Sequence, residues 1–297
     1  MSGLSAEALG ALAGLGSALT WAVTSLLVRT LVPPFQSVAI NAIRSALSGA
    51  LLLGVILLTG GAGALTSISG PSFVLLIISI VAAIGVGDTV FFDSTRRLGL
   101  GRAMSISMTY PVVAALLAIA FMDERLTPQV ALGSLLTLGG LLLIVGLRGD
   151  GEVSDAAAWR LGVAGAIVAA VAWGVSAVLM KAPLREVDAV TAQAVRLPIA
   201  GAILFVTPWA RGAVGQLRAS EPTIVWRIAG LSVLTAVSSV MYVASLKYAG
   251  VTVATVLSST APLFAIPLGL LCLGERLSAG PVIGAVVTVA GIAVLQR

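Results

Sequence analysis

The chain has 297 residues, of which 59% are hydrophobic and only 10% are charged, and its mean hydropathy is +1.11. Soluble domains are about 45–50% apolar, so this chain has too few polar residues to cover a soluble surface. The net charge of +5 comes from basic residues in short stretches between apolar segments. Basic residues there set membrane topology, and we expect no nucleic-acid partner.

Cysteine and histidine usage also excludes several kinds of site. Cys272 is the only cysteine and lies in an apolar run, and the chain has no histidine. A disulfide framework is therefore excluded, and we expect no zinc or other metal site and no cofactor. The first residues, MSGLSAEALGALAGLG, lack a basic region and merge into a full-length apolar segment. We expect no cleaved signal peptide.

The apolar segments predict an all-α polytopic membrane protein. Each segment has about 20 residues, which suffices for a helix that crosses a hydrocarbon core of about 30 Å. The longest polar connection, RGDGEVSDAAAWR, starts at residue 148 and divides the chain into a first unit (1–147), a linker (148–159) and a second unit (160–297). The predicted transmembrane helices are 8–28, 37–58, 72–94, 101–121, 128–147, 160–181, 190–210, 223–247, 252–273 and 280–296.

The two units repeat each other in sequence. At an offset of 152 residues, Trp21 matches Trp173 and Arg44 matches Arg196. Because each unit has an odd number of predicted helices, the second lies upside down relative to the first. Two inverted five-helix repeats with a site at their interface are typical of secondary transporters. Further matches at offsets of 151 or 152 are Asn41–Gln193, Thr109–Thr260, Pro111–Pro262, Gly133–Gly284 and Gly140–Gly291.

The ends of the two units resemble a known family. DERLTPQVALGSLLTLGGLLLIVG (123–146) and GERLSAGPVIGAVVTVAGIAVL (274–295) are similar to EamA-type repeats of the drug/metabolite transporter superfamily. Thr20-Trp21, the mid-helix Arg44 and the RRLGLGRA string before the fourth helix also fit. The resemblance covers essentially the whole chain. It implies a ten-helix carrier with a central cavity lined by helices 1–4 and 6–9.

The string Gly85-Val-Gly87-Asp88 spells a motif of intramembrane aspartyl proteases. Such enzymes need two carboxyl groups that share one site. The other acid nearby, Asp93, lies five residues later and therefore about 140° around the same helix. The two acids face apart, and we expect no enzyme.

Asp88 has a more favourable predicted partner in Arg44. Both residues are predicted to lie at a similar depth, and a mid-membrane arginine should face the interior and find a counter-charge. Two interpretations remain open for this pair. It is either a permanent structural ion pair, or a gate pair in which Asp88 takes up a proton or yields to substrate during transport.

The second unit breaks this symmetry, because the position equivalent to Asp88 is Ser239. Arg196 then has no obvious acid in the membrane. Either backbone carbonyls and Gln193, one turn earlier, satisfy it, or it offers its charge to a carboxylate or phosphate of the substrate.

Aromatic and proline residues complete the candidate site. Trp21 and Trp173 are predicted near mid-membrane beside small residues, where they either stack on a substrate or fill the core, and Tyr110 and Tyr242 are comparable candidates.

Proline breaks the hydrogen-bond ladder of a helix. The helix-kink candidates in the fourth and ninth helices are Pro111, Pro262 and Pro267.

These features predict a secondary carrier in the cell (inner) membrane. The expected partners are the lipid bilayer and a small-molecule substrate, an amino acid or related compound that is exported, and we expect a monomer or a homodimer. The alternative is a lipid-linked flippase component or a non-transport membrane assembly subunit. The distribution of basic residues places both termini outside. The family resemblance places them in the cytoplasm, which we prefer.

Overall fold

The computed structural model describes residues 5–31, 35–98, 103, 106–122, 127–146, 156–261, 263–264, 268 and 279–295, and helices make up its regular structure. In the first half these are α1 (Ala6–Leu31), α2 (Ser37–Leu58), α3 (Ala62–Thr66), α4 (Gly70–Ile80), η1 (Val81–Asp88), α5 (Thr89–Leu98), α7 (Tyr110–Met122) and α8 (Pro128–Gly146). In the second half they are α9 (Ala156–Leu179), α10 (Pro183–Glu186), α11 (Ala189–Val206), η2 (Pro208–Ala210), α12 (Ala213–Arg218), α13 (Pro222–Ala249), α14 (Val251–Ser258) and α16 (Ala279–Leu295).

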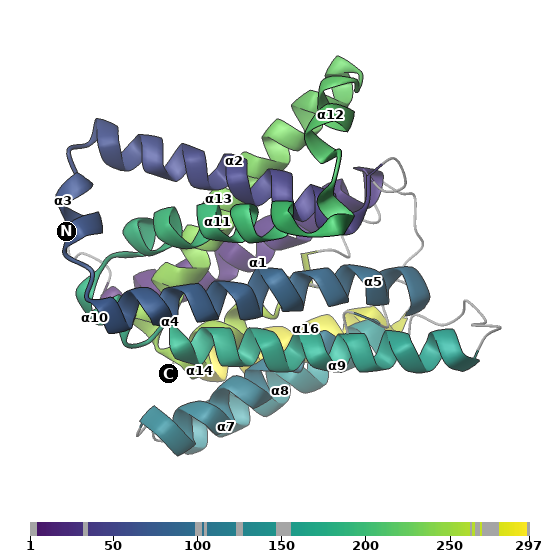
Figure 1. Cartoon of the computed structure of the whole chain (residues 1–297). Helices are drawn as coiled ribbons and strands as arrows, with labels where there is room; N and C mark the ends of the chain where they lie inside the picture. Colours follow the sequence, from purple (N-terminus) through teal and green to yellow (C-terminus); the bar gives the residue numbers. More distant parts are fainter. Residues whose placement is uncertain are drawn as a thin grey trace.

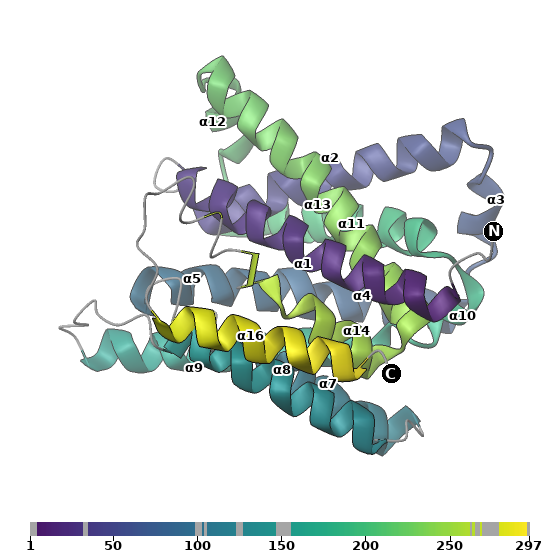
Figure 2. The same cartoon turned by 180° about the vertical axis from the view of Figure 1, so that it is seen from behind.

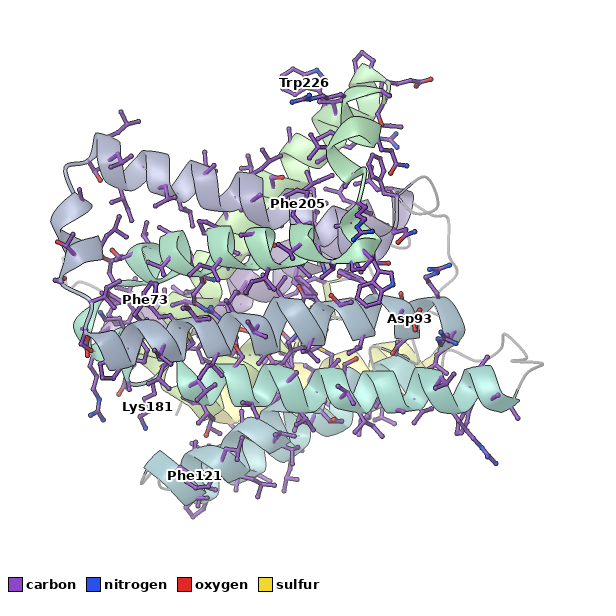
Figure 3. All side chains as sticks on the ribbon, in the orientation of Figure 1. Phe73, Asp93, Phe121, Lys181, Phe205 and Trp226 are labelled. Carbon is purple, nitrogen blue, oxygen red and sulfur yellow. The ribbon has the colours of Figure 1, made fainter. Side chains whose placement is uncertain are left out.

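Six helical segments of the described chain are long and apolar enough to cross a membrane: α1, α2, the continuous α4–η1–α5, α9, α11 and α13. Large apolar side chains such as Phe73, Phe121 and Trp226 are exposed on the outside of the bundle, as lipid contact requires (Figure 3). The protein is therefore a multi-pass membrane protein. A described helix overlaps each of the ten predicted ranges, and the fourth, fifth, ninth and tenth ranges also contain residues outside the described set.

Local sequence signals mark several helix ends. Ser69 caps α4, with Pro71 in its first turn, and Gly250 separates α13 from α14 with a φ of 81° that favours glycine. Asp188 caps α11 by accepting hydrogen bonds from the N–H groups of Val190 and Thr191 at 2.8 and 2.9 Å. Partial burial raises the pKa of Asp188, whereas these hydrogen bonds lower it. The effect of the hydrogen bonds is larger, so the pKa lies below its usual value.

The two halves run in opposite directions through the bundle. Helix α1 begins at the end of the molecule where α3 and α10 lie, whereas α9, its counterpart in the second half, begins at the opposite end (Figure 1). The view from behind shows α16 ending on the same side on which α1 begins (Figure 2). This is the inverted arrangement that the sequence repeat predicts.

The halves interlock rather than stand side by side. Helix α1 packs along α13 of the other half, and α9 packs along α4, η1 and α5. The contacts are reciprocal in detail: a Cβ on Gly10 would lie 2.6 Å from the backbone of Ala249, and one on Gly162 would lie 2.6 Å from the side chain of Leu98. These positions match at offsets of 152 and 151 residues, so the same contact is made twice.

Helices α2 and α11 cross each other with the same reciprocity. A Cβ on Gly49 would lie 2.5 Å from Pro198, and one on Gly201 would lie 2.8 Å from the backbone of Ala46. Pro198 lies inside α11, which continues through it as one helix from Ala189 to Val206. This crossing packs the middle of α2 against the middle of α11.

The third membrane segment departs from a regular α-helix. Residues Val81–Asp88 form a π-helix between α4 and α5, whereas α13, the matching segment of the second half, is a continuous α-helix. π-helical turns are rare and are found mostly at functional sites. The segment ends at Asp88.

The break in the fourth segment differs from the predicted proline kink. Residues 108 and 109 form a turn, and α7 begins immediately afterwards at Tyr110. Pro111 thus lies in the first turn of a helix, where its missing N–H needs no acceptor. It starts α7 rather than bending a continuous helix. Pro262 and Pro267 lie outside the described residues.

Candidate functional site

A cavity of about 150 Å³ lies between the two halves. Its walls come from α1, α2, α4, η1, α7, α9, α11, α13 and α14, so both repeats contribute. The structure brings together in this cavity all of the predicted substrate-binding and ion-pair residues: Trp21, Arg44, Asp88, Tyr110, Trp173, Gln193, Arg196 and Tyr242.

Arg44 and Asp88 form a salt bridge in the wall of the cavity. Their exposed fractions are only 1% and 6%. The Nε of Arg44 also donates to Asn41 Oδ1 at 2.8 Å, and one terminal nitrogen donates to Thr235 at 3.3 Å. A buried ion pair is stable only when such additional hydrogen bonds satisfy its remaining groups. The ion pair expected from the sequence is formed, and it links α2 to the end of the π-helix.

Trp173 binds the other carboxylate oxygen of Asp88. Its indole N–H donates to Asp88 Oδ1 at 3.0 Å and lies 3.2 Å from the carbonyl oxygen of Ala83 in the π-helix. This approach depends on Gly87, because a Cβ there would lie 2.5 Å from the indole nitrogen. The second half of the protein thus reaches across the cavity and holds the acid of the first half.

Aromatic rings gather around this acid. The ring centroids of Trp21 and Trp173 are 6.3 Å apart, and those of Tyr110 and Trp173 are 5.9 Å apart, both in edge-to-face geometry. The guanidinium carbon of Arg44 lies 5.8 Å from the ring of Trp21, within cation–π range. The rings therefore both pack the core and form part of the cavity surface.

Arg196 has a different set of partners from Arg44. Its three side-chain nitrogens donate to Ser79 at 3.0 Å, Gln193 at 2.8 Å and Ser176 at 3.1 Å. All three acceptors are neutral. Gln193 was expected from the sequence, whereas the two serines take the place of the expected carbonyls.

The two tyrosines lie on opposite halves and meet in the cavity. The hydroxyl of Tyr110 donates to the carbonyl oxygen of Thr255 at 2.9 Å. The hydroxyl groups of Tyr110 and Tyr242 also interact with each other. This contact ties α7 to α13 and α14.

Several polar wall residues were not singled out from the sequence. Thr235 and Ser238 lie on the same face of α13 as the predicted Tyr242, at intervals of three and four residues, and this polar stripe inside an apolar helix is the signal that would have found them. Asp93, by contrast, is exposed on α5 and pairs with Arg97 at 2.7 Å (Figure 3).

Comparison with known proteins shows the family. The EamA-like transporter family matches residues 8–146 and 160–297. An uncharacterized transporter of Archaeoglobus fulgidus is 25% identical over 74% of this chain and 75% of its own length. An uncharacterized protein of Pseudomonas aeruginosa is 32% identical over half of each chain. One crystal structure shares the fold, with a TM-score of 0.77 and 20% identity over 96% of this chain and 95% of that chain. The chain belongs to the EamA-like transporter family, and it is a membrane transporter of the drug/metabolite superfamily.

Proposed function

We propose that the protein is an alternating-access secondary carrier that exports a small metabolite, an amino acid or a related compound, without a catalytic step. The observation that supports this most is the cavity between the interlocked halves. Charged, hydroxyl and aromatic groups of both repeats converge in it. Inverted repeats that rock against each other around such a site give alternating access.

The size of the cavity favours a small solute. A protein cavity of about 150 Å³ is large enough to bind benzene, and the cavity here has the same volume. The aromatic rings of Trp21, Trp173 and Tyr110 offer surface to an apolar part of the solute, and the serine, threonine and arginine side chains offer hydrogen bonds to a polar part. Amino acids combine both features.

We propose further that the Arg44–Asp88 pair persists through the cycle, so that transport is uniport or exchange rather than proton-coupled. Three polar groups besides the salt bridge hold the pair: Asn41 and Thr235 accept hydrogen bonds from Arg44, and Trp173 donates one to Asp88. If opening separated the pair, Asp88 would be left desolvated and would take up a proton.

Counterflow in proteoliposomes tests the carrier function. Vesicles loaded with a pool of unlabelled amino acids should accumulate labelled amino acids from outside, whereas empty liposomes should not. Imposing a pH gradient should not raise the final level in the wild type. Failure of every amino acid to exchange would refute this substrate class, and accumulation driven by the pH gradient would refute the uncoupled mechanism.

We also propose that both termini lie on the cytoplasmic side of the cell membrane and that the carrier works as a monomer or a homodimer with no nucleic-acid partner. A Ser2→Cys variant in a Cys272→Ala background should react with an impermeant thiol reagent in inside-out vesicles and not in intact cells. Labelling in intact cells would place the termini outside. In inside-out vesicles, export appears as uptake of labelled substrate.

A further inference from the structure

The charged groups of the described cavity wall do not balance. They are Arg44, Asp88 and Arg196. Asp88 forms its salt bridge with Arg44. It also influences Arg196 electrostatically, but the hydrogen-bond acceptors of Arg196 are uncharged. The cavity therefore carries one excess positive charge, and that charge resides on Arg196.

The guanidinium of Arg196 is positioned but not saturated. Arginine has five N–H groups, and three of its bonds go to Ser79, Gln193 and Ser176, one from each nitrogen. Among the described residues, one N–H group on each terminal nitrogen of Arg196 then has no hydrogen-bond acceptor. The side chain is 3% exposed, so its orientation is fixed by the protein. Two N–H groups on one planar guanidinium suit a carboxylate.

A second observation also indicates a ligand in this cavity. Thr24 and Ser258 line it, and the hydroxyl oxygen of neither has a hydrogen-bond partner in the described structure. The two residues are 0% and 8% exposed. Buried hydroxyl groups normally have a partner.

The repeat explains why Thr24 is left without one. Thr24 matches Ser176 at the offset of 152 residues, and Ser176 accepts a hydrogen bond from Arg196. The corresponding arginine of the first half, Arg44, binds Asp88 instead. The single acid thus satisfies one arginine and leaves one hydroxyl of the wall available to a solute.

We propose that Arg196 is the anion-binding residue of the carrier, that it takes the carboxylate of a small amphipathic solute, and that the hydroxyls of Thr24 and Ser258 bind the solute's other polar atoms. The two repeat-related arginines then have separate roles: Arg44 is neutralised and structural, and Arg196 binds substrate. Solutes whose only charge is positive are disfavoured. This inference rests on the proposed carrier function and narrows its substrate class.

Calorimetric titration of the purified protein with three matched probes tests this assignment. Benzoate, benzamide and benzylamine share one ring and carry a negative, zero and positive charge at neutral pH. Benzoate should bind at least tenfold more tightly than benzamide, and benzylamine should bind most weakly. In Arg196→Gln the preference for benzoate should disappear, and in the matched control Arg97→Gln, a half-buried arginine outside the cavity, it should remain.

A second variant keeps Arg196 and neutralises the excess positive charge of the cavity with an added acid. Ser239→Asp restores in the second half the acid that Asp88 provides in the first, and it should abolish the benzoate preference as well. Benzoate binding no tighter than benzylamine in the wild type, including no binding of either probe, overturns the proposal. So does a preference that survives in both Arg196→Gln and Ser239→Asp.

The proposed amino-acid substrate class fails on a different measurement. If benzoate binds through Arg196 but no amino acid exchanges in proteoliposomes, the anion site stands and the amino-acid substrate class falls. If an amino acid exchanges equally well in wild type and Arg196→Gln, the carrier proposal stands and the anion site falls.

Discussion

Arg44 and Asp88, both in the first half of the protein, form a salt bridge in the cavity wall, and each is almost completely buried. Placing an arginine at mid-membrane costs about 2.5–3.5 kcal/mol on insertion scales. The salt bridge offsets this penalty only while both partners remain. Removing one partner of a buried pair leaves an uncompensated charge and is strongly destabilising, whereas removing both is far less so.

Single neutral variants of this pair should therefore be less stable than the double variant. We expect Arg44→Gln and Asp88→Asn each to lower the free energy of unfolding by about 3–5 kcal/mol, and the double variant to recover a large part of that loss. Chemical unfolding of the protein in detergent, followed by tryptophan fluorescence, measures the difference. Asp93→Asn is the exposed control and should stay near wild type. A double variant whose loss equals the sum of the single losses would show that the two charges are not coupled.

At the scale of single residues, the sequence predicted contacts correctly where an unpaired charge in the membrane would be costly. Arg44 and Asp88 could be paired in advance because a mid-membrane arginine needs a counter-charge. The bond from Trp173 to Asp88 could not be predicted, because it depends on the close approach that Gly87 permits. Ser79 as a partner of Arg196 could not be predicted either, because no local pattern indicates which segments pack on α11.

Gly87 offers a direct test of that approach. In Gly87→Ala the new Cβ would lie 2.5 Å from the indole nitrogen of Trp173, so the ring must move away from Asp88. Overpacking of this kind typically costs about 1–3 kcal/mol. We expect lower stability and a shifted tryptophan emission. Gly85→Ala is a matched control in the same π-helix, because its Cβ would make only an ordinary contact of 3.6 Å with Val81. Equal behaviour of the two variants would contradict the packing described here.

At the scale of helices, the length of the apolar segments and the glycine, proline and charged residues between them predicted most helices well. The predicted range 37–58 coincides with α2, and the loss of pattern after residue 58 reflects the turn before α3. The π-helix at 81–88 was not predictable, because its apolar residues fit either helix type and only the backbone register differs. Pro111 was predicted to kink the fourth helix but lies in the first turn of α7, and the sequence could not distinguish the two because a proline fits both inside a kink and at a helix start.

Helices α8 and α16 pack through matching small residues. A Cβ on Gly140 would lie 2.4 Å from Thr288 Oγ1, and one on Gly291 would lie 2.4 Å from Thr137 Oγ1. These four positions are related by the offset of 151 residues. The contact lies away from the cavity, since neither helix supplies a described wall residue.

Gly140→Ala should therefore weaken the helix pair without changing the cavity. We expect a loss of about 1–3 kcal/mol from overpacking, with substrate exchange per folded molecule unchanged. A Cβ on the neighbouring Gly139 would meet no atom of another helix within 4 Å, so Gly139→Ala should be neutral or slightly stabilising, as alanine favours helix. Thermal unfolding of both variants in one detergent gives the comparison. A Gly139→Ala loss as large as that of Gly140→Ala would count against this contact.

At the scale of the whole molecule, the inverted repeat was predictable because each half has an odd number of apolar segments. The contacts between the halves could not be predicted from the sequence, because the pairs α1–α13 and α5–α9 join segments that are far apart in the chain. One end of the bundle also carries polar ties between the halves. Glu186 of the second half accepts hydrogen bonds from Ser69 Oγ at 2.9 Å and Ser72 Oγ at 2.7 Å of the first half.

A carrier that alternates between two open states must separate the halves at this end in one of them. In a Cys272→Ala background, Ser69→Cys and Glu186→Cys place two thiols on opposite halves, and a short reducible cross-linker should join them. We expect cross-linking to stop counterflow in proteoliposomes and reduction to restore it. The control pair Asp93→Cys and Arg97→Cys lies on one helix, one turn apart, and its cross-link should leave exchange intact. If the cross-linked 69–186 protein still exchanges substrate at the wild-type rate, this end does not open during transport.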